Sequence, residues 1–200
     1  MLTPAALLFD MDGVLVDSFH AWLRALNAAL RRYGHEPLTE ETFRDAYWGH
    51  DLYENLRRLG IDDRVGAFCL TIFGDYVDGI TMYPATRDVL GQLDGYPMAL
   101  VTNTPQRCVD SILSHFDIDA FFDVVVTPDD VDQGKPDPEM LLYACTQLTV
   151  DPEGTVFVGD TDSDVRAGRA AGCTVVGVQV EADVRVGSIA ELPELLATKQ

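Results

Sequence analysis

Short apolar runs alternate with amphipathic segments over the second half of the chain. The runs have the length of buried strands, and the segments between them repeat apolar residues at helical spacing. The runs lie at residues 98–102, 124–127, 156–158 and 174–178, and a similar run spans residues 5–9 near the start. Strands that alternate with helices favour a parallel sheet with right-handed crossovers. The pattern therefore predicts an α/β fold with a doubly wound parallel sheet.

Residues 18–81 have a different periodicity, in which apolar side chains recur three or four positions apart. Segments of this kind begin near Phe19, Thr39, Leu52 and Val65, and the last continues to Tyr76. We therefore expect an all-helical insert after the first strand. The predicted domains are an α/β core of residues 1–17 and 82–200 and a small helical domain of residues 18–81.

The charge of the chain narrows its possible partners. Its 200 residues carry a net charge of −19, and the 14 basic residues include only two lysines, Lys135 and Lys199. Such an acidic chain is expected to bind neither nucleic acid nor anionic membranes. A Lys-poor acidic surface is also typical of proteins that work in concentrated salt, where cations screen the self-repulsion.

The cysteines and the apolar runs bear on the cellular compartment. The cysteines are widely spaced and form no CxxC pair, so we expect reduced, buried thiols and no zinc site. No apolar run approaches the roughly 20 residues of a membrane helix, and the early first strand leaves no room for a signal peptide. We therefore expect a cytoplasmic protein. Its oligomeric state, monomer or homodimer, stays open.

Two carboxylates, Asp10 and Asp12, follow the first predicted strand directly. Their spacing aims both side chains to one side of an extended backbone, and Gly13 lets the chain turn away. Neighbouring carboxylates repel each other unless a cation joins them, and Mg²⁺ prefers oxygen ligands. One carboxylate can then act as a nucleophile and the other as an acid and base. A solvated acidic turn with the same composition is the alternative.

Three other predicted strands also end in polar residues, and parallel strands carry ligand sites at their carboxyl ends. The segment 102–105 reads Thr-Asn-Thr-Pro and offers hydroxyl, amide and backbone donors. Lys135, between Gly134 and Pro136, is a compact cation that suits a phosphoryl oxygen or a nucleophilic carboxylate. The segment 159–164 adds further carboxylates, without the Gly and Glu positions of an EF-hand loop.

Taken in order, the four strand ends read Asp-x-Asp-Gly, Thr-Asn, Gly-Lys-Pro and Gly-Asp-x-x-x-Asp. From Leu7 to Gly172 the chain thereby resembles phosphatases of the haloacid dehalogenase superfamily, whose core is Rossmann-like. Its helical insert resembles the cap of the phosphoglycolate phosphatase and beta-phosphoglucomutase branch. The resemblance implies Mg²⁺-dependent hydrolysis of a small phosphorylated metabolite, a phosphoglycolate-like ester or a sugar phosphate, through an aspartyl phosphate.

The resemblance assigns the two acids after the first strand different roles. It implies that Asp10 is the nucleophile and a Mg²⁺ ligand. Asp12 would protonate the leaving oxygen, later activate the water, and give the metal its backbone carbonyl. An isolated Asp titrates near pH ~4, so the site must raise the pKa of Asp12, whereas Asp10 should stay ionised beside the metal.

The same resemblance implies roles at the other three strand ends. Thr102 and the backbone amide of Asn103 would hold the phosphoryl oxygens. Lys135 would neutralise charge on the nucleophile and the phosphate. Asp160 would complete the metal site, and Asp164 would order the waters of the metal or Lys135.

The chain has some of the residues that related activities of similar proteins require and lacks others. A halide leaves without a proton, so Asp12 favours phosphoryl transfer, and residues 18–81 contain no Lys for the Schiff base of phosphonate hydrolases. A phosphomutase or a pyrophosphatase is an alternative, although His20 lies too close to Asp17 to match the mutase histidine clearly. A phosphoaccepting signalling or binding domain is a more distant alternative.

Substrate choice should lie in the helical insert, which can move about hinges near residues 17–18 and 79–82. We expect Trp48, Gly49 and His50 to form a substrate-binding loop. Arg24 or Arg57 can bind a carboxylate or a second phosphate of the substrate. In the alternative, Trp48 packs in the core of the insert and these arginines are solvated.

Overall fold

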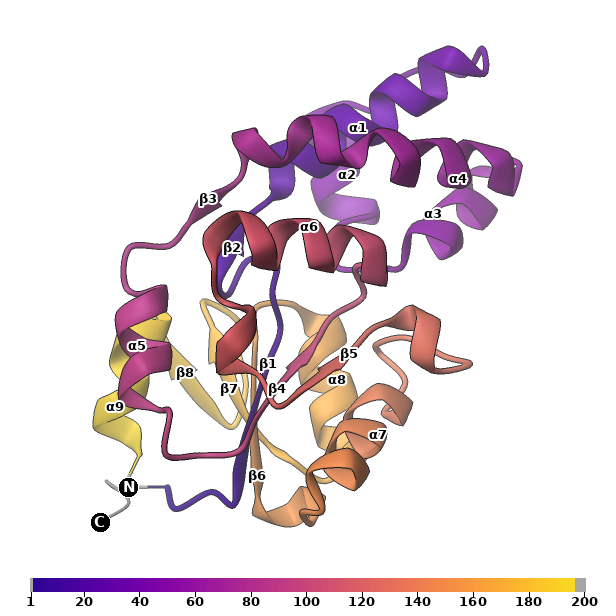
Figure 1. The fold of residues 1–200 in the computed structure, drawn as a ribbon. Helices are drawn as coiled ribbons and strands as arrows, with labels where there is room; N and C mark the ends of the chain where they lie inside the picture. The colour runs from indigo at the N-terminus through magenta and orange to yellow at the C-terminus, as the bar shows by residue number, and fades with distance from the viewer. Residues whose placement is uncertain (1, 197–200) are drawn as a thin grey trace.

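A six-stranded parallel sheet forms the centre of the molecule in the computed structural model, which describes residues 2–196 (Figure 1). The spatial order of the strands is β5-β4-β1-β6-β7-β8. Their bounds are β1 (Ala6–Phe9), β4 (Met98–Val101), β5 (Val124–Val126), β6 (Thr155–Gly159), β7 (Thr174–Val178) and β8 (Val184–Val186). The parallel sheet confirms the predicted fold class. Because β1 lies between β4 and β6, the polar segments that follow these strands start side by side.

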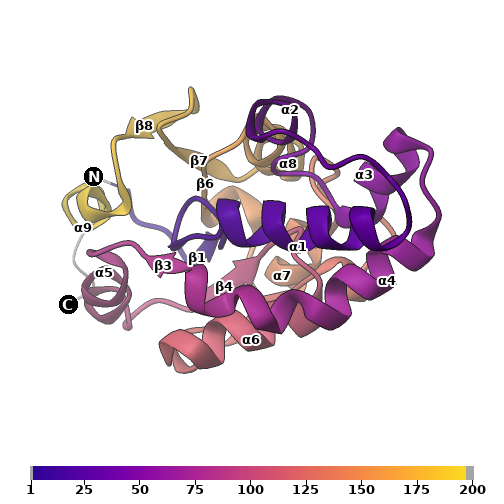
Figure 2. The same cartoon turned by 90° about the horizontal axis from the view of Figure 1, so that it is seen from above.

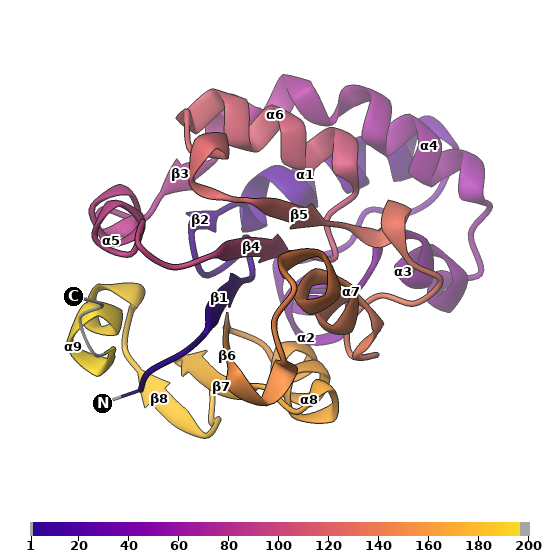
Figure 3. The ribbon, with the colours of Figure 1, turned by 60° about the horizontal axis from the view of Figure 1, so that its bottom comes forward.

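Helices cover both faces of this sheet, which explains why its strands are apolar throughout. Leu7 and Phe9 belong to the core that contains buried residues of α5 (Thr86–Gln92), α6 (Gln106–Phe116) and α9 (Leu192–Leu195). Ala6 and Leu8 face the opposite core, with α7 (Glu139–Leu148) and α8 (Asp162–Ala171). Figure 3 shows α7 and α8 on one side of the sheet and α6 on the other.

The helical insert, residues 18–81, lies over the carboxyl ends of the central strands, as Figure 2 shows from above. It contains α1 (Phe19–Arg32), α2 (Glu40–Ala46), α3 (Leu52–Leu59), α4 (Asp63–Ile72) and the 3-10 helix η1 (Phe73–Gly79). Thr39, Asp51 and Asp62 cap α2, α3 and α4 by accepting backbone N–H groups. The last predicted helix changes to 3-10 geometry at Phe73, next to Gly74, a poor α-helix former.

A short antiparallel ribbon joins the insert to the sheet. In it, β2 (Val16–Asp17) pairs with β3 (Thr81–Met82). Both connections to the insert thus run side by side, at the two places where the sequence analysis expects hinges. The division of the chain into two domains at these positions stays a prediction.

The remaining elements are short. Two short elements carry no clear signal in the sequence. They are β8, a three-residue strand whose middle residue is the exposed Arg185, and α9 at the end of the described chain. The 3-10 helices are η2 (Asp119–Phe121), η3 (Pro128–Asp130), η4 (Pro152–Gly154) and η5 (Ile189–Glu191). The cysteines are free and buried, as expected. Among residues 2–196 no helix has the length and apolar character needed to cross a membrane.

Candidate active site

The four polar strand-end segments meet at one edge of the sheet, beneath the helical insert. Asp10 follows β1, Thr102 follows β4, Asp160 follows β6, and Lys135 lies in the loop between β5 and α7. Because all these strands are parallel, their carboxyl ends lie at the same edge. The fold therefore brings the predicted core residues together: Asp10, Asp12, Thr102, Asn103, Lys135, Asp160 and Asp164.

Lys135 is the central cation of this site. Its Nζ lies 2.9 Å from Asp10 Oδ1 and 2.6 Å from Asp164 Oδ1, and it donates to the Val101 carbonyl at 3.0 Å. Its side chain is only 2% exposed. Burial disfavours the charge, but the two carboxylates outweigh burial and hold the pKa of Lys135 above its ordinary value. The ammonium therefore stays charged and neutralises part of the acidic cluster.

Asp164 positions Lys135 and the first turn of α8. Its Oδ1 contacts Lys135, while its Oδ2 accepts from Thr161 N at 3.0 Å, Thr161 Oγ1 at 2.6 Å and Asp160 N at 3.3 Å. Thr161 is the N-cap of α8, and its hydroxyl in turn accepts from the Asp164 backbone. Of the two alternatives for Asp164, ordering metal waters or ordering Lys135, the contacts favour Lys135.

Asp12 is held by hydroxyl groups rather than by a cation. Its Oδ2 accepts from Thr104 Oγ1 at 2.7 Å and from Thr102 Oγ1 at 3.4 Å, and its Oδ1 accepts from the Ser18 hydroxyl. Burial raises the pKa of Asp12 above its ordinary value, against the effect of these donors. A proton donor at neutral pH needs a shift in this direction. For these contacts of Ser18 and Thr104 the sequence carries no signal beyond a hydroxyl beside a predicted motif.

Burial also raises the pKa of Asp10 to about 7, against the attraction of Lys135. The resemblance of the sequence predicts that Asp10 stays ionised beside a metal. The environment that the protein groups alone provide shifts its pKa the other way. A cation that joins the cluster lowers this pKa and favours the ionised carboxylate near neutral pH.

Three carboxylates can hold a metal ion at this site. Asp10, Asp160 and Asp164 each offer a ligand oxygen, and these atoms all lie within 4.8 Å of one another. Asp160 Oδ1 is buried and accepts from no donor in the described chain, which is costly unless a cation binds it. Burial also raises the pKa of Asp160 well above its ordinary value. The all-oxygen donor set fits a hard divalent cation.

Two further observations bear on this metal site. Gly13 has φ +83°, and a Cβ at this position would overlap the Asp160 carboxylate, so only glycine lets the turn pass so close. The carboxylate of Asp12 lies outside the cluster of ligand oxygens. The predicted contribution of Asp12 to the metal therefore rests on its backbone carbonyl alone.

Asn103 links the lysine loop to the helical insert through its side chain. Its Oδ1 accepts from Lys135 N at 2.9 Å, and its Nδ2 donates to the carbonyls of Lys135 at 2.9 Å and Gly49 at 3.0 Å. A Cβ on Gly49, whose φ is +80°, would lie 2.9 Å from the Thr161 methyl group. The insert thus contacts the core at two points beside the site. The sequence predicts amide and backbone donors at this segment, but it carries no signal for the contact between the Asn103 side chain and Gly49.

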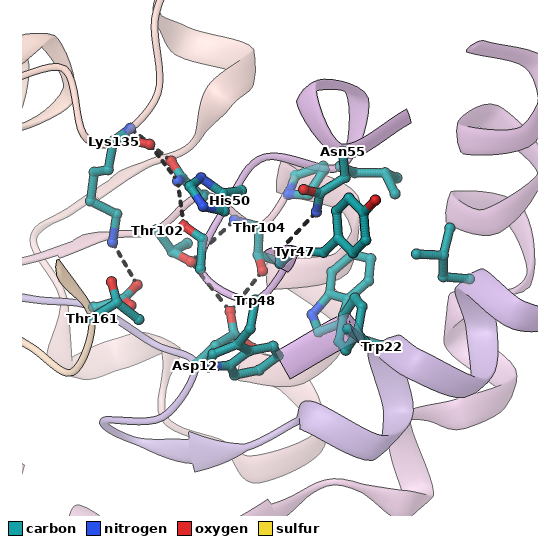
Figure 4. A pocket seen from close by; sticks show the side chains of 17 residues that line it. Asp12, Trp22, Tyr47, Trp48, His50, Asn55, Thr102, Thr104, Lys135 and Thr161 are labelled. Carbon is teal, nitrogen blue, oxygen red and sulfur yellow. Dashed lines mark hydrogen bonds and ion pairs between the residues drawn. The ribbon is translucent and has the colours of Figure 1, made fainter. Parts of the chain in front are cut away.

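A cavity lies between these core residues and the insert (Figure 4). The predicted loop residues Trp48, Gly49 and His50 all line it, as do the core residues Asp10, Asp12, Thr102, Asn103 and Lys135. The structure adds Asn55, Trp22 and Tyr47, for which the sequence carries no signal beyond helical spacing. Arg24 and Arg57, the proposed anion ligands, are not among the residues that line this cavity, and neither is His20.

Comparisons with known proteins agree with this architecture. Residues 7–178 match the model of the haloacid dehalogenase-like hydrolase family. The chain is 35% identical over 190 residues to the phosphoglycolate phosphatase of Pseudomonas putida, covering 88% of this chain and 69% of that protein. It is 30% identical over 213 residues to the phosphoglycolate phosphatase of Chromobacterium violaceum, covering 96% of both.

A solved structure shows the same fold. The HAD-superfamily hydrolase of subfamily IA from Geobacter sulfurreducens has a TM-score of 0.81 at 26% identity, covering 98% of this chain and all of that one. The family model and the relatives span most of the chain, including every strand-end motif. The chain therefore belongs to the haloacid dehalogenase-like hydrolase family, and it is a metal-dependent phosphatase.

Proposed function

We propose that this phosphatase is a Mg²⁺-dependent phosphomonoesterase that acts on a small phosphorylated metabolite through a phosphorylated Asp10. The observation that carries the proposal is the buried Lys135 ammonium, 2.9 Å from the Asp10 carboxylate at a cavity that Asp12 also lines. Two relatives described above are phosphoglycolate phosphatases, so phosphoglycolate is the first candidate substrate. Sugar phosphates are the second.

In the first step a carboxylate oxygen of Asp10 attacks the phosphorus atom, and the bond from phosphorus to the leaving oxygen breaks. Asp12 gives its proton to that oxygen, so the leaving group departs as an alcohol. Lys135 offsets the negative charge that gathers on the phosphoryl oxygens and on Asp10. Thr102 and the backbone N–H of Asn103 orient the phosphoryl group.

In the second step Asp12, now a carboxylate, takes a proton from a water molecule. The water oxygen attacks the phosphorus atom of phosphorylated Asp10 and releases inorganic phosphate. Asp12 thereby regains its proton, and Asp10 returns as a carboxylate. The hydroxyls of Ser18 and Thr104 support this exchange, because they hold the Asp12 carboxylate in one orientation.

Asp10, Asp160 and the backbone carbonyl of Asp12 would hold the Mg²⁺ ion. When bound, the ion supplies positive charge that neutralises the phosphoryl oxygens and the nucleophile. Asp164 acts as a positioning residue, because its oxygens contact Lys135, Thr161 and the Asp160 backbone. Residues 18–81 act as a cap that excludes bulk water and selects the leaving group.

The test is a phosphate-release assay with phosphoglycolate, sugar phosphates and pyrophosphate, with and without Mg²⁺. We expect metal-dependent release from at least one phosphomonoester. Asp10→Asn should lower kcat by about a thousandfold or more, because it removes the nucleophile. Asp162→Asn is the control, since Asp162 is an exposed acid at the start of α8, after β6, and lies 4.0 Å from the exposed Arg166. Full activity of Asp10→Asn would contradict the proposed mechanism.

A further inference from the structure

The cavity wall contributed by the helical insert is almost entirely apolar. It is built from side chains of α1, α2, α3 and the loop between α2 and α3. Figure 4 shows Trp22, Tyr47 and Asn55 on the side of the cavity away from Lys135. Its apolar members are Trp22, Leu26, Phe43, Tyr47, Trp48 and Leu52. A leaving group in reach of the Asp12 proton must lie against this wall, because Asp12 lines the same cavity.

This wall offers no permanent cation to a second anionic group. Lys135 is the one Lys or Arg among the described residues that line the cavity, and it already contacts two carboxylates. His50 also lines the cavity, but its Nδ1 lies 3.7 Å from Glu54 Oε2. This nitrogen is buried and makes no hydrogen bond in the described chain, and a neighbouring carboxylate disfavours a second anion at the same place.

The nearby arginines face other hollows. Arg57 lines an open hollow beside the lysine loop, and Arg44 lines one with His20 and Asp160 on the far side of Trp48. The Arg44 guanidinium lies 4.0 Å above the Phe19 ring, and Asp12 does not line its hollow. A carboxylate on the leaving group would therefore be buried beside Asp12 without a counter-charge, which is strongly unfavourable.

Asn55 brings an unfilled hydrogen-bond acceptor to the apolar wall. It is 3% exposed and lines the cavity from α3. Its Nδ2 donates to the Tyr47 carbonyl at 2.9 Å, which fixes the orientation of the amide. Its Oδ1 is buried and receives no hydrogen bond in the described chain. A buried acceptor of this kind is stabilised by a ligand that brings a donor, such as a hydroxyl group.

The room beside these groups is small. The cavity has a volume of about 50 Å³, which holds about four water molecules. A long leaving group therefore does not fit without a movement of the insert. The small volume, the lack of a cation and the unfilled acceptor all bear on the leaving group of the substrate.

We propose that the cavity selects phosphomonoesters with a short, uncharged, hydroxyl-bearing leaving group, and that Asn55 Oδ1 accepts the hydrogen bond of that hydroxyl. The proposal rests on the phosphatase function proposed above and narrows its substrate class. It ranks such esters above phosphoglycolate, whose leaving group has the same size and carries a carboxylate. Asn55 is thus a specificity-determining residue.

The test compares kcat/KM for three esters that differ at one position: 2-hydroxyethyl phosphate, ethyl phosphate and 2-phosphoglycolate. Glycerol 3-phosphate and 3-phosphoglycerate form a second neutral and anionic pair. We expect each neutral hydroxylated ester to exceed its carboxylate partner by about tenfold or more, because the carboxylate is buried without a cation.

Asn55→Ala tests the predicted hydrogen bond. It should lower kcat/KM for 2-hydroxyethyl phosphate by about five- to tenfold. The value for ethyl phosphate, which has no hydroxyl, should change less than about twofold and shows that the variant is folded. Equal losses for both esters would overturn the role of Asn55. Arg44→Gln is the control for the neighbouring hollow and should leave the ratio of neutral to anionic esters unchanged.

The possible outcomes separate this inference from the function on which it rests. If 2-phosphoglycolate is hydrolysed as well as 2-hydroxyethyl phosphate or better, the substrate class is wrong, while loss of activity in Asp10→Asn keeps the phosphatase mechanism. A loss of phosphoglycolate turnover in Arg44→Gln would show that a carboxylate binds from the other side of Trp48, and would also overturn the inference. If no phosphomonoester is hydrolysed at all, the proposed function itself fails.

Discussion

Asp160 has a buried carboxylate oxygen that no donor in the described part of the chain reaches. Asp10, close to it, has a pKa raised to about 7 by burial. Both carboxyl groups therefore hold their protons to a higher pH in the folded protein than in an unfolded chain, where Asp titrates near pH ~4. Without a cation, two ionised carboxylates in this buried place destabilise the folded protein. The same two carboxylates suit a divalent cation.

This environment predicts a pH-dependent response to metal. Since the folded pKa of Asp10 lies above the unfolded value, the folded state binds more protons between pH ~4 and ~7. The contribution of Asp10 to the free energy of unfolding is complete below pH ~4 and is lost as the pH rises through about 7. Mg²⁺ must displace those protons, so it should raise the melting temperature more at pH 7.5 than at pH 5.

Thermal denaturation with and without millimolar Mg²⁺ at constant ionic strength measures this difference. Asp160→Asn provides the control for general screening of the acidic surface, and should lose most of the shift at pH 7.5. Equal shifts at both pH values would show that the metal does not bind at the protonated carboxylates.

The loop between α2 and α3 contacts the core through Gly49, whose carbonyl accepts from Asn103 and whose Cα lies against Thr161. Thr161 also caps α8 and bonds Asp164, so the same threonine contacts the insert and the acidic cluster. The position of the insert is therefore coupled to the geometry of the site through one short loop.

Gly49→Ala tests this coupling. The added Cβ both strains a backbone at φ +80° and lies 2.9 Å from the Thr161 methyl group. We expect a loss of about 1–2 kcal/mol in the free energy of unfolding from the backbone, and a several-fold fall in kcat/KM from the displaced loop. Chemical denaturation and steady-state kinetics measure the two effects.

Gly34→Ala is a matched control in the same insert. Gly34 also has φ +80°, but a Cβ there would meet nothing within 4 Å. This variant should show a similar loss of stability with unchanged kcat/KM. An equal fall in kcat/KM for both variants would show that loss of stability, rather than contact with Thr161, explains the effect of Gly49→Ala.

The overall charge of the protein acts over longer distances than any single contact. A net charge of −19 on 200 residues produces self-repulsion that weakens the compact state. The described surface ion pairs, such as Arg169 with Asp183 and Arg185 with Glu181, involve exposed side chains and contribute little. Screening of the repulsion should therefore outweigh the loss of these pairs when salt is added.

We expect the melting temperature to rise by several degrees between low and molar KCl, because the Debye length falls from tens of ångströms to about 3 Å. Thermal denaturation over a KCl series measures the rise. The same series in sucrose, which is excluded from the protein surface but carries no charge to screen, controls for general solvent effects. A constant or falling melting temperature in KCl would contradict adaptation of this surface to salt.

The amino-acid sequence was sufficient to predict the parallel sheet and the close approach of the motifs at its strand ends. Apolar runs as short as residues 98–101 favour strands buried on both faces, and parallel strands present their carboxyl ends at one edge. The placement of Asp10, Thr102, Lys135 and Asp160 together follows from that topology. The starts predicted near Thr39 and Leu52 agree with α2 and α3, because Thr39 and Asp51 cap the N-termini of these helices through local interactions.

Contacts between segments far apart in the chain were decided only by the tertiary packing. The Asn103 side chain reaches Gly49 and Thr104 reaches Asp12. Asn55 lines the cavity and has an unfilled acceptor, while Arg57 lines another hollow. The helix and strand propensities of single residues carry no information on which side chains meet between the insert and the core. Those contacts depend on how the two folded surfaces pack against each other. The sequence therefore determined the reaction type, and the docking of the insert decided which leaving group has room, charge balance and a hydrogen-bond partner.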